Sequence, residues 1–239
     1  MNGGETTAAS EQQVRTMFDR IAGHYDLMNS VMSAGLHHRW RTRAADLAAL
    51  RPGQRAVDLC AGTGDLAIEL KRRVGAEGEV IGIDFSEPML ELARHKAEAA
   101  GLPVSFVHGN ALELPFKDGY FDAATVGFGV RNLADLDRGI AEMARVVRPG
   151  GRVAVLEITS PKRPPLSWFY SLWFEQVVPL LGTAAGDHDA YSYLPESVRR
   201  FPEAQELAAR MDAVGLDAIR YLLLAGGIVA IHSGVVREG

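Results

Sequence analysis

The sequence predicts an α/β protein with a mostly parallel sheet, helices on both faces of the sheet and a C-terminal antiparallel hairpin. Three observations lead to this fold class. Apolar runs of strand length alternate with segments of helical periodicity from residue 55 onward. Glycine and proline mark many of the boundaries between these segments. Two further apolar runs close the chain with almost nothing between them, which is typical of a hairpin.

Each element is expected from its own residues. Five apolar runs should form the parallel strands, at residues 55–60, 79–85, 104–110, 121–128 and 151–158. Helical spacing predicts helices at residues 64–74, 86–100, 133–147 and 202–215. Ser86 is suited to cap the second of these helices and Gly101 to end it. The third helix should stop at the breaker cluster 149–151. The hairpin would pair residues 216–224 with residues 227–236.

A chain of 239 residues suits a single domain with appendages. We expect a disordered tail at residues 1–12 and one domain at residues 13–239. Residues 13–50 would form an N-terminal helical cap, and residues 159–205, which are rich in aromatic residues and proline, a substrate-side insertion. Polar residues interrupt the most apolar part of this insertion, so a buried helix is favoured over a membrane span. A lid over an apolar substrate is the alternative.

Composition narrows the function classes. The net charge is -5 and no long basic run occurs, so we expect no nucleic-acid partner. Cys60 is the single cysteine, so no intrachain disulfide can form, which fits a reducing cytoplasm. The polar N-terminus lacks the apolar stretch of a signal peptide. The seven histidines and the cysteine show no metal-ligand spacing, so we expect no metal.

A glycine-rich loop follows the first predicted strand. Gly62, Gly64 and Ala67 have the G-x-G-x-x-A spacing of an adenosine-cofactor loop that leads into a helix. Asp84 follows twenty positions after Gly64, where an acid binds ribose hydroxyls. The pattern alone leaves two cofactors open, NAD and S-adenosylmethionine. A C-terminal hairpin is not typical of an NAD-binding fold, because that fold continues with a second βαβαβ half.

Charge also favours S-adenosylmethionine. Asp58, Asp65 and Asp84 surround the loop, and carboxylates repel a pyrophosphate but suit a sulfonium cofactor with an ammonium group. We expect Asp58 to neutralise this ammonium and Asp84 to accept from both ribose hydroxyls. Thr63 would contact the methionine end of the cofactor. Asn110 and Ala111 follow the third strand, where an amide can contact the adenine edge.

The motifs resemble a known family. The core motifs of class I S-adenosylmethionine-dependent methyltransferases are matched by VDLCAGTGDL, GIDFSEPML, GNALELPF, FDAATVGFGVRNL and RVVRPGGRVAVLEI. The menaquinone/ubiquinone biosynthesis C-methyltransferases are more specifically resembled by HYDLMNSVMSAGLHHRWR, YSYLPESVRRFP and GGIVAIHSG. The resemblance covers residues 14–234 and implies a Rossmann-like sheet, S-adenosyl-L-methionine as cofactor, and methylation of a ring carbon of a prenylated hydroquinone. The reaction would convert demethylmenaquinol to menaquinol, with benzoquinol specificity left open.

The resemblance also implies site residues. Thr63, Asp84, Asn110 and Ala111 would bind the cofactor, and Gly127 stands where some relatives have serine. The sequence departs from the family pattern outside the core motifs. The departures are His38 in place of arginine or lysine, and Leu223 and Ala225 in place of asparagine and threonine.

Five residues are candidates for the reaction itself. Arg131 stays charged, so it suits the stabilisation of a developing phenolate or the orientation of a water molecule, with Asn132 as helper. His37 can titrate near neutral pH and could accept a proton. Tyr25 and Tyr193 could hydrogen-bond a quinol oxygen. The reduced quinol is the expected substrate, because an oxidised quinone ring is a poor nucleophile.

Three alternative functions stay open. They are an NAD-dependent oxidoreductase, a methyltransferase for another small aromatic or lipid acceptor, and a non-catalytic regulator that binds the cofactor. We expect a cytoplasmic location, with peripheral contact at the inner membrane face as a further hypothesis. A homo-oligomer is also left open.

Overall fold

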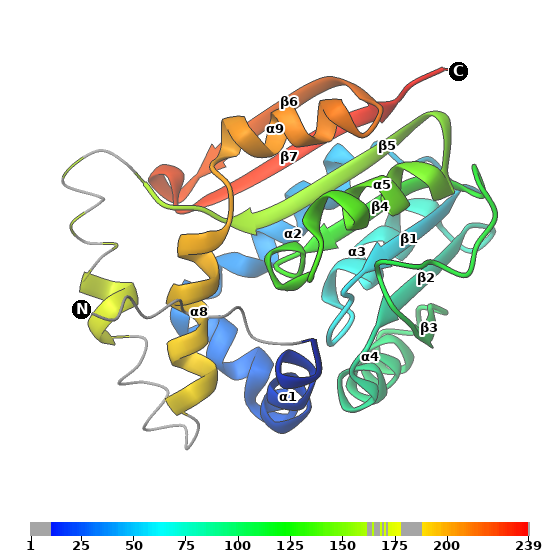
Figure 1. Ribbon diagram of the computed structural model, residues 1–239. Helices are drawn as coiled ribbons and strands as arrows, with labels where there is room; N and C mark the ends of the chain where they lie inside the picture. Colours follow the sequence, from blue (N-terminus) through cyan, green and yellow to red (C-terminus); the bar gives the residue numbers. More distant parts are fainter. Residues whose placement is uncertain are drawn as a thin grey trace.

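The computed structural model describes residues 11–161, 164, 168, 170, 172–177 and 188–238 (Figure 1). Within these residues, seven strands form one sheet in the order β3-β2-β1-β4-β5-β7-β6. The strands are β1 (Arg55–Leu59), β2 (Glu79–Asp84), β3 (Ser105–His108), β4 (Phe121–Gly127), β5 (Val147–Ile158), β6 (Leu216–Leu224) and β7 (Val229–Val236). The first five are parallel, and β7 lies antiparallel between β5 and β6. The predicted parallel sheet with a C-terminal hairpin is therefore confirmed.

Helices cover both faces of the sheet, as predicted. The described α-helices are α1 (Glu11–Ser33), α2 (Leu36–Leu47), α3 (Asp65–Val74), α4 (Glu87–Ala99), α5 (Leu136–Val146), α8 (His188–Arg200) and α9 (Ala204–Ala213). Short helical turns occur at η1 (Val130–Asn132), η2 (Trp173–Val177) and η3 (Ala225–Gly227). The Ser86 hydroxyl accepts from the Met89 N–H and caps α4 as expected. No helix in the described part of the chain is long and apolar enough to cross a membrane.

Two hydrophobic cores lie on opposite faces of the sheet, beneath the helices that cover these faces in Figure 1. On one face, buried side chains of α2, α3 and α4 pack against the strands, with Leu70 and Leu90 fully buried. On the other face, α5 and α9 contribute the buried Ile140 and Leu207. Because the alternate residues of each strand point to opposite faces, both cores draw on the same short apolar runs. This burial holds the strand ends, where the candidate site lies, in a rigid frame.

Three details differ from the sequence prediction. Helix α1 begins at Glu11, so the end of the expected tail is helical, while residues 1–10 lie outside the described part of the chain. Strand β5 begins at Val147 and passes through the predicted breakers, where its register with β4 is irregular. Gly150 has a φ of +74°, so it provides a bend within the strand rather than the end of the helix.

The N-terminal cap is divided between two places. Helix α2 packs against α3 and β5 on one face of the sheet. Helix α1 packs against α4 and α8 and crosses the carboxyl ends of the strands (Figure 1). Within the predicted insertion, α8 is described. Of the apolar segment expected as a buried helix or lid, residues 164–182, only residues 164, 168, 170 and 172–177 are described, and the rest of this prediction lies outside the described residues.

Candidate functional site

The carboxyl ends of β1, β2 and β4 meet at a small cavity of about 30 Å³. Its polar wall comes from Gly62, Asp84 and Asn132, and no lysine or arginine in the described part of the chain lines it. The other lining residues are Phe18, Tyr25, Cys60, Phe85, Met89, Gly127, Phe128, Gly129 and Leu133. Ligand cavities generally occupy at least about 300 Å³. A ligand the size of a nucleoside therefore requires α1, which supplies Phe18 and Tyr25, to move outward.

The glycine loop is tied to the end of β2 by one carboxylate. Asp84 Oδ2 accepts from the Gly62 N–H at 2.8 Å, and Asp84 Oδ1 accepts from the Ser86 N–H at 2.9 Å. Burial raises the pKa of Asp84, although these backbone donors oppose the shift. Cys60 and Phe128 both line the cavity with positive φ angles, 50° and 62°. Such strained backbone is found where a ligand site must be shaped closely.

Asp58 lies behind this cavity rather than on its wall. Its side chain is 1 % exposed, and Oδ1 accepts from the Thr125 hydroxyl at 2.6 Å. Burial raises the pKa of Asp58 to about 7, with the Thr125 hydrogen bond opposing the shift. The expected contact of Asp58 with a cofactor ammonium remains a prediction, and it requires a water molecule or a movement of the loop.

Thr63 and Asp65 face helices rather than the small cavity. The Thr63 hydroxyl donates to Asp26 Oδ1 at 2.6 Å, and Lys96 Nζ donates to Asp26 Oδ2 at 2.9 Å. Lys96 also pairs with Asp65, and Arg41 lies 3.8 Å from the same carboxylate. Burial opposes ionisation, but Arg41 and Lys96 lower the pKa of Asp65. Our expectation that Asp65 repels a pyrophosphate is therefore wrong, because two cations compensate its charge.

The remaining predicted cofactor residues divide into two groups. Gly127 lines the small cavity, and Gly64 begins α3 with a φ of +83° but does not line the cavity. Asn110 Oδ1 accepts from the Leu112 N–H at 2.8 Å, and Ala111 is buried in the core. The structure therefore does not bring these two residues into the cavity wall, because a local turn engages the asparagine side chain.

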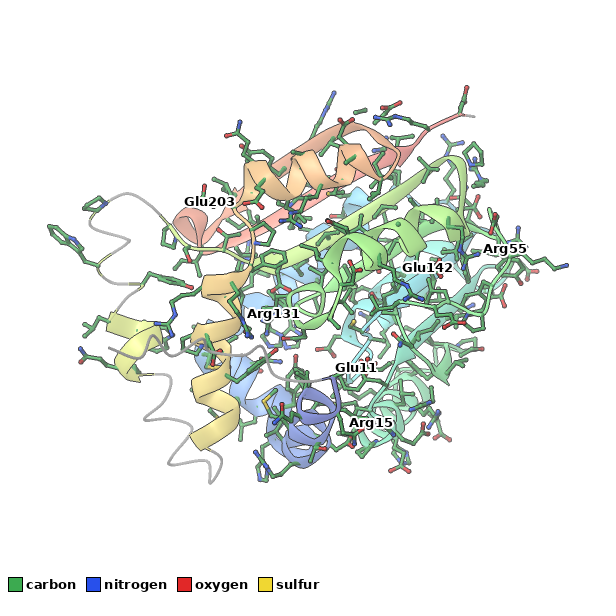
Figure 2. The ribbon with its side chains drawn as sticks, viewed as in Figure 1. Glu11, Arg15, Arg55, Arg131, Glu142 and Glu203 are labelled. Atoms are coloured by element: carbon green, nitrogen blue, oxygen red, sulfur yellow. The ribbon has the colours of Figure 1, made fainter. Side chains whose placement is uncertain are left out.

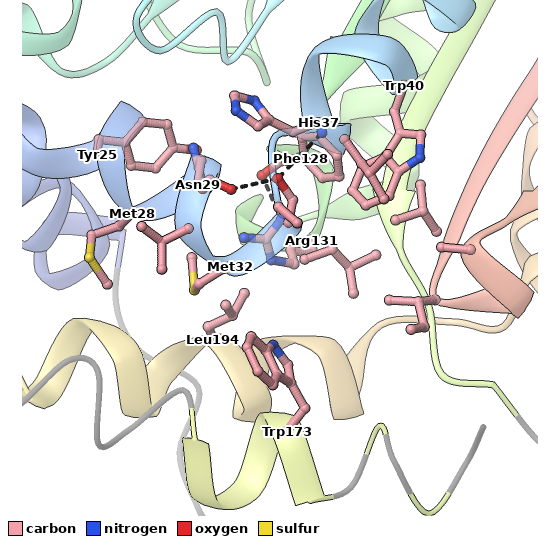
Figure 3. Close-up of a pocket in the computed structure, with 18 of the residues that line it drawn as sticks. Tyr25, Met28, Asn29, Met32, His37, Trp40, Phe128, Arg131, Trp173 and Leu194 are labelled. Atoms are coloured by element: carbon pink, nitrogen blue, oxygen red, sulfur yellow. Dashed lines mark hydrogen bonds between the residues drawn. The ribbon is translucent and has the colours of Figure 1, made fainter. Parts of the chain in front are cut away.

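A second, larger cavity of about 340 Å³ lies beside the first (Figure 3). Phe18, Tyr25 and Phe128 line both cavities, so the two share a wall. Most other lining side chains are apolar and come from α1, α2, η2, α8 and the β5–β7 end of the sheet. They include Met17, Ile21, Met28, Met32, Trp40, Ile158, Trp173, Leu194, Ile228 and Val229. The methionines adapt to ligands of irregular shape. The sequence does not single out this wall, because helical apolar residues are usually core.

Arg131 is the one fully charged side chain in the described lining of the larger cavity (Figure 3). Its Nη1 donates to Glu157 Oε1 at 2.7 Å and to the Phe128 carbonyl at 2.6 Å. Its buried Nε has no hydrogen-bond partner among the described residues. Burial disfavours the charge, yet Glu157 raises the pKa of Arg131. Sequence reasoning missed Glu157, although an acid at the end of an otherwise apolar strand is a detectable signal.

Asn132 and the two predicted tyrosines lie near Arg131. Asn132 lines the small cavity, and its buried Oδ1 has no hydrogen-bond partner among the described residues. Tyr25 comes from α1 and Tyr193 from α8, and both line the larger cavity. Burial raises the pKa of Tyr193, so its phenol stays neutral and able to donate. Residues about 170 positions apart in the chain thus line one cavity, and their predicted contact with a quinol oxygen stays a prediction.

His37 lines the larger cavity, but its environment does not suit a proton acceptor. The Arg41 guanidinium contacts Nδ1, and because arginine only donates, Nδ1 must be the acceptor nitrogen. Nε2 then carries the proton and lies 3.0 Å from the Ser30 hydroxyl oxygen. Burial, with Arg41 next in importance, lowers the pKa of His37 to about 4. The expected role as a base is therefore corrected to a structural link between α1 and α2.

His37, His38 and Asp65 place ligand-type atoms within 4.8 Å of one another. A cation already occupies this region, because Arg41 contacts His37 and lies 3.8 Å from Asp65. The cluster is therefore an arginine-centred network, and its chemistry does not suit a metal ion.

Taken together, the sheet order, the glycine loop after β1 and the acid at the end of β2 define a protein of the class I methyltransferase fold. The comparisons with known proteins then give the particular family. The chain belongs to the ubiE/COQ5 methyltransferase family, whose model matches residues 6–236. This membership decides against the NAD-dependent oxidoreductase that the loop spacing alone had left open.

Curated relatives are similar over nearly their full length. A demethylmenaquinone methyltransferase of Thermus thermophilus is 49 % identical, covering 91 % of this chain and 99 % of the relative. A ubiquinone/menaquinone biosynthesis C-methyltransferase, UbiE, of Serratia proteamaculans is 42 % identical, covering 97 % and 94 %.

Solved structures share the fold. The [4+2]-cyclase SpnF has a TM-score of 0.72 at 19 % identity, covering 97 % of this chain and 98 % of that chain. A SAM-dependent methyltransferase of Thermotoga maritima, described as a possible histamine N-methyltransferase, has a TM-score of 0.66 at 22 % identity, covering 92 % and 98 %. At these identities the similarity concerns the fold alone.

Proposed function

We propose that this protein is an S-adenosyl-L-methionine-dependent C-methyltransferase that converts demethylmenaquinol to menaquinol in menaquinone biosynthesis. The observation that supports this most directly is the shared wall between the cofactor-side cavity and an apolar cavity with one buried arginine, Arg131. An apolar space suits a prenylated ring, and the guanidinium suits one of its oxygens. The relatives named above act in quinone biosynthesis according to their names.

The chemistry of the small cavity fits the proposed cofactor. Asp84 and Asn132, which carry oxygen acceptors, line it, and among the described residues no cationic side chain does. Acceptors suit ribose hydroxyls and an ammonium group, whereas a pyrophosphate requires donors. We propose that Gly62, Asp84, Gly127 and Asn132 contact the cofactor. When bound, it supplies a methyl group activated by a sulfonium.

The other predicted cofactor residues support the loop from behind. We propose that Asp58 balances the ammonium through water, since its carboxylate lies just behind the cavity. Thr63 fixes the loop to α1 by its bond to Asp26. Asn110 and Ala111 reach the adenine only through their backbone, because the asparagine oxygen is engaged by the Leu112 N–H.

We propose that Arg131 orients the acceptor through its free Nε, because this buried donor has no protein partner among the described residues. Tyr25 and Tyr193 would position the second ring oxygen from opposite sides of the cavity. The chemistry requires the reduced quinol, whose ring carbon gains electron density from an adjacent oxygen. The enzyme therefore supplies position and electrostatics rather than covalent catalysis.

A membrane surface is the proposed source of this acceptor. The larger cavity suits a ring but has no room for a long prenyl tail. Val31 and Leu36 line it and are still 48 % and 39 % exposed, while the neighbouring Leu27 on α1 is 63 % exposed. Exposed apolar side chains at a cavity mouth are typical of membrane contact. We propose that the protein works at the cytoplasmic membrane face.

Vesicle flotation tests this contact. The double variant Leu27→Ser and Val31→Ser should bind less to vesicles of anionic lipid than the unchanged protein. Leu223→Ser is the control, because Leu223 is 50 % exposed on β6 and does not line the cavity. Equal loss of flotation in both variants would contradict the proposed surface. A homo-oligomer remains an expectation from the sequence, and light scattering of the full chain tests it.

The decisive experiment is incubation with methyl-labelled cofactor and reduced demethylmenaquinone, with product mass as the readout. We expect one added methyl group per quinol and no product from the oxidised quinone. Arg131→Ala should lose product by about 100-fold or more while cofactor binding persists, consistent with the loss of one transition-state contact. Methylation of the oxidised quinone at an equal rate would overturn the proposal.

A further inference from the structure

Arg131 and Glu157 form an ion pair that is buried beside the larger cavity. Their side chains are 8 % and 1 % exposed, and the Nη1–Oε1 distance is 2.7 Å. Arg131 lines the cavity, whereas Glu157 is not part of its wall. The carboxylate therefore lies behind the arginine and has no direct access to a ligand in the cavity.

The protein holds this carboxylate from several sides. Glu157 Oε1 also accepts from the Ile158 N–H at 2.8 Å, and Oε2 accepts from the Arg131 backbone N–H at 3.3 Å. These bonds point one edge of the guanidinium toward Glu157 and the Phe128 carbonyl. The buried Nε has no hydrogen-bond partner among the described residues. The guanidinium thus has one nitrogen paired with Glu157 and one donor without a protein partner.

Arg131 and Glu157 carry opposite charges, so the ion pair has no net charge. The titratable groups with a shifted pKa near it include His37 from α2, Cys60 after β1 and Tyr193 from α8, and Asp58 and Asp84 act on Cys60 from the ends of β1 and β2. Burial raises the pKa of Tyr193 and Cys60 and lowers that of His37 to about 4. Within the described residues, the acceptor oxygen therefore faces a guanidinium whose charge is already compensated.

We propose that Glu157 is a positioning residue that cancels the charge of Arg131, so that the arginine orients the acceptor oxygen without trapping it as a tightly held phenolate. The inference rests on the proposed function. Methylation at a ring carbon requires the electron density of the oxygen to move into the ring. An uncompensated cation would stabilise that density on oxygen in the ground state, and such stabilisation does not accelerate the reaction.

A bound naphthol measures this effect without methyl transfer, because its ionisation changes its absorbance. We would titrate 1-naphthol bound to the full-length protein, with no cofactor present. In Glu157→Gln the bound naphthol should ionise with a pKa about one unit lower, a tenfold change, since an unpaired cation favours the anion. Glu142→Gln is the matched control. Glu142 pairs with Arg145 and accepts a backbone N–H, and Figure 2 shows it apart from Arg131.

Variants that change the charge of Arg131, of Glu157 or of both make the test independent of Glu157→Gln alone. The double variant Arg131→Gln with Glu157→Gln restores zero net charge, so the naphthol pKa should return to its value in the unchanged protein. Arg131→Gln alone leaves the Glu157 carboxylate unpaired and should raise the pKa of the bound naphthol. If Glu157→Gln does not fold, the difference in naphthol pKa between the double variant and Arg131→Gln still tests the inference. Equal naphthol pKa values across the folded series overturn the inference.

Steady-state kinetics gives a second readout. Glu157→Gln should lower both KM for the quinol and kcat, whereas a merely structural role would raise KM and lower kcat. Glu157→Asp, which retains the charge, should recover a substantial part of kcat. If the unchanged protein binds neither naphthol nor quinol, the proposed acceptor is wrong and the inference falls with it. If it binds naphthol normally but the series shows no shift, only the inference fails.

Discussion

Gly62 and Gly64 belong to the same loop, but substitution by alanine should affect them differently. Both have positive φ angles, +53° and +83°. A Cβ on Gly62 would meet nothing within 4 Å. A Cβ on Gly64 would lie 2.8 Å from both Ala93 Cβ and Phe106 Cζ, in the core between α4 and β3. The two positions therefore separate backbone strain from steric overlap.

The expected magnitudes follow from these surroundings. The left-handed conformation costs an alanine about 1–2 kcal/mol, which is the whole expected effect at Gly62. At Gly64, overpacking of the core adds about 1–3 kcal/mol. Gly64→Ala should therefore lower the free energy of unfolding by about 2–5 kcal/mol, and Gly62→Ala by about 1–2 kcal/mol.

Urea unfolding followed by circular dichroism, without ligand, measures both values. Calorimetric titration with S-adenosylhomocysteine provides the functional contrast. Gly62 lines the small cavity and Gly64 does not, so Gly62→Ala should lose more affinity for each kcal/mol of stability lost. Equal destabilisation of the two variants would refute the steric argument, and equal affinity of Gly62→Ala and the unchanged protein would refute the cofactor assignment.

Two more predictions concern Asp58 and Asp26. Burial raises the pKa of Asp58 from 3.8 to about 7, so the native state retains its proton more strongly than the unfolded chain. The stabilisation that the protonated Asp58 contributes to the folded state is fully present below about pH 4. It is lost as the pH rises to about 7, which lowers the free energy of unfolding by at most about 4 kcal/mol. Asp58→Asn should therefore be more stable than the unchanged protein at pH 8 and similar at pH 4. Urea unfolding at both pH values measures this, and a variant that is less stable at pH 8 would contradict the prediction. Asp26 accepts from Thr63 and Lys96, which attaches α1 to the cofactor loop. Asp26→Ala should cost about 1 kcal/mol of stability, since the site is partly exposed, and should speed the exchange of S-adenosylhomocysteine in stopped-flow fluorescence. Unchanged exchange rates would show that α1 does not control access.

The local sequence was sufficient to predict the helices and strands and part of the candidate site. The strand runs, the Ser86 cap and the hairpin depend on residues close together in the chain, so periodicity and turn chemistry predict them. The same holds for Gly62 and Asp84, since each follows a strand at a fixed distance. Parallel strands then bring both to one edge of the sheet, where the Gly62 N–H donates to Asp84.

Two errors arose where the role of a residue depends on charged partners. Asp65 was expected to oppose an anion, but Lys96 and Arg41 compensate it from α4 and α2. His37 was expected to accept a proton, but Arg41 occupies its acceptor nitrogen. The partners of Asp65 lie far from it in the sequence, whereas Arg41 stands four residues after His37 on the same helix, a spacing that does place the two side chains together.

By itself, the sequence determined the α/β class, the glycine loop with its acid at the end of β2, and Arg131 after β4, because short-range patterns specify each of them. Only the tertiary structure decided that α1 forms the wall common to both cavities, that Glu157 lies behind Arg131, and that the Arg131 Nε is left without a partner among the described residues. The physical reason is that charge compensation and the shape of a cavity depend on how separate elements pack. Packing joins residues that no local pattern connects.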